Sequence, residues 1–221
     1  MPALDTIDLE TAPEPAASII VLHGLGADGN DFVPFAEEID LRGIGPVRWV
    51  FPHAPTRPVT INGGYVMRAW YDIVGTDLGQ REDEAGLRAS RLDVEALIAR
   101  ERGRGVAASR IVLAGFSQGC AMALMTGLRH AERLAGLAGL SGYLPLATIT
   151  PAERSDANAL VPIFLAHGSA DTVIPLARAS ASRDALRAMG HAVEWHEYPM
   201  PHAVCAEEVR DLQRWLLDVL G

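Results

Sequence analysis

The chain has 221 residues, of which 49% are hydrophobic and 21% are charged, so its composition is that of a folded domain and excludes a disordered chain or a membrane protein. Its formal net charge is −9, with 28 acidic residues against 19 basic ones, all of them arginine. Because affinity for nucleic acid depends mainly on neutralising phosphates, this balance argues against a nucleic-acid partner. The acidic N-terminus does not resemble a signal peptide, so we expect a cytoplasmic protein without integral membrane association.

The first half of the chain alternates short apolar runs with polar loops. Residues 3–10 are predicted to form a weak edge strand, and residues 18–22 and 47–51 are predicted to be buried strands. A glycine-rich loop at 23–30 follows the first buried strand, and residues 31–39 have the composition of a short helix.

Residues 56–81 show no regular period, although they contain several glycines and large apolar side chains. Irregular stretches of this length usually have a functional role. We therefore expect a lid or a wall of an acyl pocket. The alternative is a surface excursion whose aromatic side chains anchor it to the body of the domain.

The second half repeats the alternation of strand and helix. The predicted strands are 111–114, 135–140, 161–166 and 192–197. The predicted helices are 82–102, 120–128, 175–189 and 203–220, with a polar loop at 148–159. Short, continuously apolar strands between helices are typical of a parallel sheet covered on both faces, so residues 1–221 are predicted to form a single α/β domain.

The segment Gly115-Phe-Ser-Gln-Gly119 joins a predicted strand to a predicted helix. The pattern Gly-x-Ser-x-Gly is typical of a nucleophile elbow, a strained turn that presents the serine hydroxyl above the end of the sheet. A Cβ atom at either glycine would collide where the strand and the helix cross closely. On its own, the pentapeptide also fits a glycine-rich helix start capped by Ser117.

Three candidate catalytic residues, Ser117, Asp171 and His202, each follow the end of a predicted strand, where ligands bind in open parallel sheets. Their order along the chain is the one expected for an elbow nucleophile. His202 would take the serine proton and return it to the leaving group, while Asp171 would orient the imidazole. Asp156 competes for the acid role but lies in a loop before a strand, and His196 lies inside the last strand.

The oxyanion of a tetrahedral intermediate needs preorganised donors. The backbone N–H of Gln118, at the helix start, is expected to supply one, and the N–H of Leu25 in the glycine-rich loop the other. His23, which precedes that loop, is expected to orient it by a hydrogen bond. The other histidines, expected to be non-catalytic, are His53, His130, His167 and His191.

The cysteines, Cys120 and Cys205, are expected to be free thiols. Neither they nor the histidines show the spacing of a metal site, so no metal and no cofactor are expected. Cys120 is an alternative nucleophile, but it lies past the turn and away from the apex of the elbow.

Blocks of residues spread over most of the chain resemble a known family: the small bacterial carboxylesterases grouped with acyl-protein thioesterases and lysophospholipases, all α/β-hydrolases. The blocks are Leu22–Phe32, Phe51–Pro55, Arg68–Ile73, Gly115–Gly119, Leu140–Tyr143, His167–Asp171 and Met200–Cys205 with Glu207 and Glu208. The chain departs from the pattern at Cys120, where a small residue is common, and at Pro201, where glycine is frequent.

The resemblance implies a Ser117–Asp171–His202 triad and an oxyanion hole from Leu25 and Gln118. It also implies that the loop holding Trp70 walls the acyl channel, and Leu25 and Tyr143 are further substrate-contact candidates.

The function expected from this resemblance is that of a serine carboxylesterase, without a cofactor, which hydrolyses short- to medium-chain esters or thioesters through an acyl-serine. The expected partner is a small acyl ester, and the expected assembly is a monomer or a homodimer. The alternatives are an acyl-protein thioesterase, a lysophospholipase and, more remotely, a non-catalytic binding protein on a hydrolase scaffold. An acidic surface argues against docking on anionic lipids.

Overall fold

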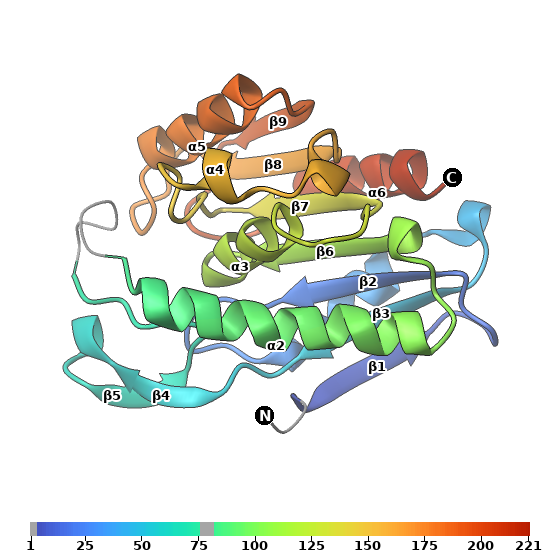
Figure 1. The fold of residues 1–221 in the computed structure, drawn as a ribbon, viewed down its shortest axis with the longest axis horizontal. Helices are drawn as coiled ribbons and strands as arrows, with labels where there is room; N and C mark the ends of the chain where they lie inside the picture. Colours follow the sequence, from blue (N-terminus) through green and yellow to red (C-terminus); the bar gives the residue numbers. More distant parts are fainter. Residues whose placement is uncertain (1–3, 76–81) are drawn as a thin grey trace.

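A seven-stranded sheet forms the centre of the part of the chain that the computed structural model describes, residues 4–75 and 82–221 (Figure 1). Its strands are β1 (Thr6–Glu10), β2 (Ala17–Leu22), β3 (Val47–Pro52), β6 (Ile111–Phe116), β7 (Gly136–Leu140), β8 (Ile163–Gly168) and β9 (Val193–Tyr198). They lie in the order β1-β3-β2-β6-β7-β8-β9. The predicted edge strand is confirmed as β1, which pairs antiparallel with β3, and the other strands run parallel.

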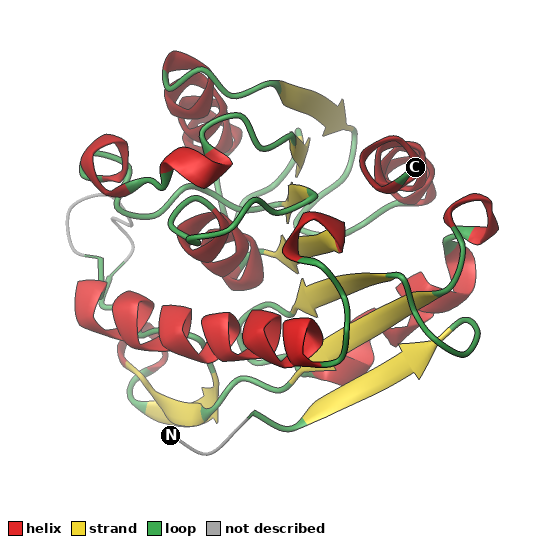
Figure 2. Ribbon diagram, turned by 45° about the vertical axis from the view of Figure 1, so that its right-hand side comes forward, coloured by secondary structure: helices red, strands yellow, loops and turns green. Residues whose placement is uncertain are grey.

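Helices cover both faces of the sheet. One layer contains α2 (Glu84–Gly103), α3 (Gln118–Gly127) and α5 (Leu176–Ala188), and the other contains α1 (Val33–Glu38) and α6 (Ala206–Leu220). In Figure 2 the helix that ends at the C label, α6, lies on the opposite side of the strands from the first layer. The expected α/β-hydrolase fold, with a mostly parallel sheet between two helical layers, is thereby confirmed.

The apolar strands bury side chains on both faces. In β2, Ile20 and Leu22 belong to the core beneath α2 and α3, whereas Ile19 and Val21 belong to the core beneath α1 and α6. This two-sided burial explains why the strand is apolar at consecutive positions and does not alternate.

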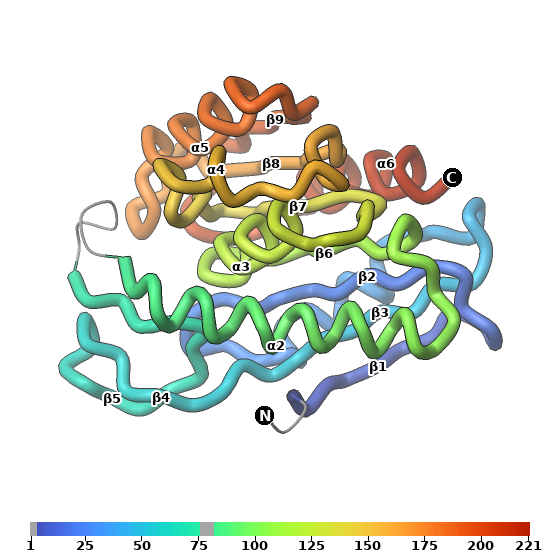
Figure 3. Tube along the Cα trace, in the orientation of Figure 1, coloured from blue at the N-terminus to red at the C-terminus, as the bar shows by residue number. Residues whose placement is uncertain are grey.

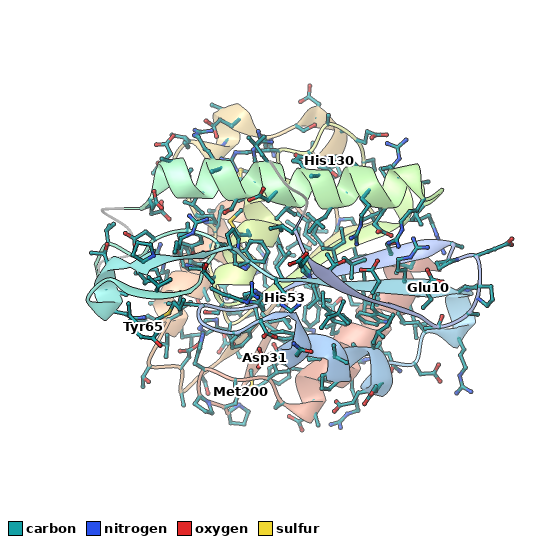
Figure 4. All side chains as sticks on the ribbon, turned by 90° about the horizontal axis from the view of Figure 1, so that it is seen from below. Glu10, Asp31, His53, Tyr65, His130 and Met200 are labelled. Atoms are coloured by element: carbon teal, nitrogen blue, oxygen red, sulfur yellow. The ribbon has the colours of Figure 1, made fainter. Side chains whose placement is uncertain are left out.

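A two-stranded hairpin occupies part of the segment predicted to be irregular. β4 (Thr56–Val59) pairs antiparallel with β5 (Tyr65–Arg68), and Thr56 lies opposite Arg68. Most side chains of the hairpin are exposed, so the sequence shows no alternation of apolar and polar residues there. Tyr65, for example, is 69% exposed and is labelled in Figure 4 at the end of the molecule away from Glu10. Residues 76–81 of the predicted lid lie outside the described residues.

Smaller differences concern the polar segment at 148–159. It contains the one-turn helix α4 (Thr150–Glu153) and the 3-10 turn Asp156–Asn158, where a loop was expected.

The carboxyl ends of the parallel strands lie together at the end of the sheet next to the β4–β5 hairpin, on the left in Figure 3. That end is where a ligand site is expected in a sheet of this topology.

Candidate active site

Ser117 lies on a strained turn between β6 and α3. Its backbone has φ 56° and ψ −115°, a conformation that residues other than glycine rarely adopt. A Cβ atom at Gly115 would lie 2.2 Å from the carbonyl oxygen of Gly119, and one at Gly119 would lie 1.9 Å from the carbonyl oxygen of Leu22. The collision predicted for both glycines is thus confirmed. The Ser117 side chain does not cap α3, so the capping interpretation is wrong.

The structure brings Ser117, His202 and Asp171 together. The Oγ atom of Ser117 lies 3.0 Å from Nε2 of His202, and Nδ1 of His202 lies 2.6 Å from Oδ2 of Asp171. The other carboxylate oxygen of Asp171 accepts from the backbone N–H groups of Val173, at 2.8 Å, and Ile174, at 2.9 Å. These bonds fix the carboxylate, and the carboxylate in turn fixes a tautomer of His202 whose Nε2 accepts the serine hydrogen.

His167 supports the acid although it was expected only to be non-catalytic. Its buried Nε2 donates to the carbonyl oxygen of Ile174 at 2.8 Å and lies 3.4 Å from Oδ2 of Asp171. The remaining histidines have partners elsewhere: Gly29 for His53, Glu95 for His130, Val161 for His191 and Glu194 for His196. The rival acid, Asp156, lies in the 3-10 turn that precedes β8, and the carboxylate that bonds His202 is that of Asp171.

The residues expected to donate backbone N–H groups to an oxyanion are Gln118 and Leu25. Gln118 is the first residue of α3, where an N–H has no partner within the helix. The N–H of Leu25 has no acceptor among the described residues, whereas the neighbouring N–H groups of Gly26 and Ala27 donate to the carbonyls of Arg68 and Gly24. Leu25 and Gln118 both line the same cavity as Ser117.

His23 orients the peptide unit that carries the Leu25 N–H, as the sequence predicts. The Nδ1 atom of His23 donates to the carbonyl oxygen of Gly24 at 2.7 Å, and Nε2 accepts from the N–H of Ala54 at 3.0 Å. Burial lowers the pKa of His23, which keeps the ring neutral and able to accept. Because the Gly24 carbonyl and the Leu25 N–H belong to one planar peptide, a fixed carbonyl also fixes the direction of the N–H.

Trp70 is not among the residues that line the cavity, although Tyr71 and Ile73 of the same loop are, so its expected contact with the substrate stays a prediction. Its side chain is fully buried, and its indole N–H donates to the carbonyl oxygen of His23 at 2.9 Å. The next residue, Tyr71, lines the cavity in its place. An aromatic residue in an irregular segment gives no sequence signal of the direction in which its side chain points.

The side chain of Gln118 joins this supporting network. Its Oε1 accepts from the backbone N–H of Trp70 at 2.7 Å, and its Nε2 donates to the backbone carbonyl of Tyr71 at 2.8 Å. A chain of hydrogen bonds therefore runs from Gln118 through Trp70 and His23 to the peptide of Leu25. The sequence predicts a role only for the backbone N–H of Gln118, because hydrogen bonds from a side chain to main-chain partners leave no sequence pattern.

A cavity of about 1010 Å³ lies above Ser117. Its lining is mostly apolar, with a few polar groups, as is usual for small-molecule sites. The candidates Leu25 and Tyr143 both line it, as do Ser117 and His202. Its other lining residues include Asp31, Phe32, Phe35, Ile61, Tyr71, Ile73, Phe116, Ile174, Arg178 and Val204.

Cys120 does not fit the role of a nucleophile. It is 1% exposed, does not line the cavity, and burial raises the pKa of its thiol to about 12. Gly139 and Gly142 make room for it, since a Cβ atom at either position would lie within 2.6 Å of its side chain. Both cysteines are free thiols, as predicted.

Residues 4–75 and 82–221 contain no group of three or more His, Cys, Asp or Glu side chains that could hold a metal ion. Nor is any helix there long and apolar enough to cross a membrane.

Attack on an acyl carbon requires a hydroxyl beside an oriented base, with donors facing the oxygen that becomes negative. The groups around Ser117 meet these requirements at the carboxyl edge of a sheet with this topology, which defines a serine hydrolase with the α/β-hydrolase fold. The chain belongs to the phospholipase/carboxylesterase family, which it matches over residues 9–220.

The chain is similar to proteins from a fungus and from plants. Acyl-protein thioesterase 1 of Yarrowia lipolytica is 37% identical over 221 residues, which span 98% of this chain and 97% of the relative. The crystal structure of Zea mays acyl-protein thioesterase 2 is 30% identical, with a TM-score of 0.85 over 97% of this chain and 99% of that one. The crystal structure of Arabidopsis thaliana SOBER1 is 29% identical, with a TM-score of 0.87 over 93% of this chain and 99% of that one. These likenesses support a hydrolase of the esterase or thioesterase type.

Proposed function

We propose that the chain is a carboxylesterase that hydrolyses short- to medium-chain acyl esters through an acyl-serine intermediate. The observation that carries the proposal is the 3.0 Å separation of Ser117 Oγ from His202 Nε2 inside a largely apolar cavity. As Oγ attacks the carbonyl carbon, its proton passes to Nε2, and Asp171 stabilises the imidazolium that forms. The N–H groups of Leu25 and Gln118 donate to the oxyanion.

Collapse of this tetrahedral intermediate releases the alcohol and leaves the acyl-serine. The bond from the acyl carbon to the leaving oxygen breaks, and that oxygen takes the proton from Nε2 of His202. A water molecule then attacks the acyl-serine, with His202 again taking and returning the proton. The products are the carboxylic acid, the alcohol and the unmodified Ser117.

Two arms of the cavity divide the substrate between them. The leaving-group arm, formed by Asp31, Phe32, Phe35, Phe116 and Val204, lies on the side of α1 and α6, and Phe116 packs against the His202 ring at 4.8 Å. The acyl arm lies on the side of α2, α3 and α5, where Tyr71, Tyr143 and Ile174 belong to the core and Ile73 packs against it. Arg178 of α5 and Ile61 of the turn between β4 and β5 complete the acyl arm. Because His202 returns its proton to the leaving group, we assign the acyl chain to the arm away from His202.

The acyl arm supports short to medium chains. Its apolar part is formed by Ile61, Ile73 and Ile174, but it also meets the hydroxyls of Tyr71 and Tyr143. A long alkyl chain in this arm would also remove the partly exposed guanidinium of Arg178 from water without giving it a hydrogen bond.

A second candidate function is the hydrolysis of acyl thioesters on proteins. It is favoured by the 37% identity, over nearly the full length of both chains, to a protein named acyl-protein thioesterase 1. The residues and steps would be the same, with a thiol in place of the alcohol as the leaving group. The substrate preference of the purified protein distinguishes the two functions.

The test is to measure kcat/KM for ethyl esters and matched thioesters from acetyl to hexadecanoyl, together with an acylated peptide and a lysophospholipid. We expect the highest values for small esters with acyl groups between butyryl and decanoyl. Ser117→Ala and His202→Ala should each reduce turnover by roughly 10⁴-fold or more. Ser169→Ala, which alters an exposed serine near Asp171, is the matched control and should retain activity. Full activity in Ser117→Ala would contradict the proposal.

A further inference from the structure

The two arms of the cavity carry opposite charges. Among the described lining residues, a carboxylate, Asp31, lies in the leaving-group arm and a guanidinium, Arg178, lies in the acyl arm. Asp31 is an exposed side chain at the start of the α1 region, where Figure 4 labels it near His53. An acyl arm built only to hold an alkyl chain would not need a cation.

Among the described residues, Tyr143 and Glu82 contact the guanidinium of Arg178. Its guanidinium carbon lies 3.9 Å above the centre of the Tyr143 ring, and Nη2 lies 3.5 Å from Oε1 of Glu82. Glu82 does not line the cavity, and its other oxygen accepts from the N–H of Leu146 at 2.9 Å. In this ion pair, the guanidinium of Arg178 is therefore on the side of the cavity, and the carboxylate of Glu82 is on the side away from the cavity.

Two tyrosine hydroxyls extend the polar surface next to Arg178. The hydroxyls of Tyr71 and Tyr143 lie 2.8 Å apart, and both side chains are almost fully buried. Burial raises the pKa of both phenols, so both remain protonated. One O–H donates to the other hydroxyl, and the second O–H can donate to a ligand. A methyl group placed against this surface would offer no acceptor, whereas a carboxylate offers several and matches the planar fork of an arginine.

We propose that Arg178 selects acyl groups that end in a carboxylate, so that the preferred substrates are half-esters of short dicarboxylic acids. This inference rests on the proposed esterase function and on the assignment of the acyl chain to the arm that contains Arg178. The charge pattern also orients such a substrate, because Asp31 repels its free carboxylate from the leaving-group arm while Arg178 attracts it to the acyl arm.

The test compares monoethyl succinate, glutarate and adipate with ethyl butyrate, pentanoate and hexanoate, and follows acid release in a pH-stat. The quantity measured is the selectivity ratio, kcat/KM for the half-ester divided by kcat/KM for the neutral ester with the same number of acyl carbons. We expect the ratio to exceed one for at least one chain length. Arg178→Met should lower that ratio by about tenfold or more while neutral esters are still hydrolysed.

Glu82→Gln provides a second test with the opposite sign. The amide keeps an acceptor for the Leu146 N–H but removes the negative charge that competes with the substrate for Arg178, so the ratio should rise. A structural role for the Arg178–Glu82 pair would not produce opposite changes in the two variants. Arg183→Met, on the same helix but with its guanidinium over Trp195 at 4.9 Å, is the matched control and should leave the ratio unchanged.

The outcomes separate this inference from the proposed function. Equal ratios in the wild type and Arg178→Met at every chain length would overturn the selectivity proposal. A ratio that does not rise in Glu82→Gln would overturn it even if Arg178→Met fails to fold. If the wild type hydrolyses neither class of ester, the proposed function itself is contradicted.

Discussion

Replacing Gln118 by alanine should separate the role of its side chain from the role of its backbone in the active site. The variant keeps the backbone N–H that we assign to the oxyanion hole. It removes the amide that bonds the N–H of Trp70 at 2.7 Å and the carbonyl of Tyr71 at 2.8 Å. Any loss of activity must therefore arise from movement of the segment that supports His23 and Leu25.

The expected size of the effect follows from burial. Gln118, Trp70 and Tyr71 are at most 3% exposed, so both backbone groups lose their partner in a site with little access to water. Each buried group left without a hydrogen bond costs about 1–3 kcal/mol. We expect the free energy of unfolding to fall by about 3 kcal/mol, which lowers Tm by roughly 6–12 °C in a domain of this size.

Turnover should fall as well, because the Leu25 N–H is displaced although it is not removed. Removal of one oxyanion donor typically costs roughly 10²–10³ in kcat, so a displaced donor should cost about 10- to 100-fold. The assay is steady-state hydrolysis of ethyl butyrate at a temperature where both proteins are fully folded. The fall should appear mainly in kcat, since the acyl arm retains its side chains.

Asn158→Ala is the matched control for this experiment. Asn158 is another buried amide, with bonds to Leu134, His130 and Glu132, and it lies away from the cavity. Its removal should reduce stability by a similar amount and leave kcat unchanged. The reasoning is refuted if Gln118→Ala keeps wild-type kcat, or if Asn158→Ala loses as much kcat as Gln118→Ala does.

Three further variants test other parts of the structure. Gly119→Ala should prevent stable folding, because the new Cβ atom would lie 1.9 Å from the carbonyl oxygen of Leu22. Circular dichroism and urea unfolding measure this effect, and a folded, active variant would contradict the close crossing of β6 and α3. Burial raises the pKa of Glu208 from 4.5 to about 8, so between these pH values the folded state binds more protons than the unfolded state. The free energy of unfolding of the wild type should therefore fall as the pH rises from 4.5 to 8. This decline amounts to at most about 5 kcal/mol at pH 9, and Glu208→Gln should remove it, as measured by urea unfolding. Identical pH profiles of the variant and the wild type would count against this assignment. Cys120→Ala should retain at least about a third of wild-type kcat, because the thiol is buried outside the cavity; a loss comparable with that in Ser117→Ala would restore the cysteine as nucleophile.

Those parts of the fold that depend on continuous apolar runs could be predicted from the sequence. The buried strands β2, β3, β6, β7 and β8 each contain such a run, and their alternation with helices predicts the mostly parallel sheet. The hairpin β4–β5 could not be predicted, because its side chains are largely exposed and its stability comes from backbone pairing. The end of β6 differs from the prediction for a similar reason. The strand continues through Gly115 to Phe116, but a glycine interrupts the apolar run from which the strand was predicted.

In the candidate site, the residues whose side chains carry the chemistry could be predicted from the sequence, whereas the residues that support them by hydrogen bonds could not. Ser117, Asp171 and His202 follow strand ends, and their residue types indicate their chemistry, so the sequence is sufficient to bring them together. The support from Gln118 and Trp70 could not be predicted, because it depends on backbone partners 47 or 48 positions away. The distribution of charge between the two arms likewise required the three-dimensional arrangement.

The central claim is that Ser117 is the nucleophile and that His202 activates it. The most direct measurement is to label the purified protein with a fluorophosphonate and identify the adduct by mass spectrometry, while esterase activity is followed in the same sample. The account predicts one adduct per chain, on Ser117, formed in step with the loss of activity and strongly slowed in His202→Ala. An adduct on another residue, or full activity in protein fully labelled at Ser117, would contradict it.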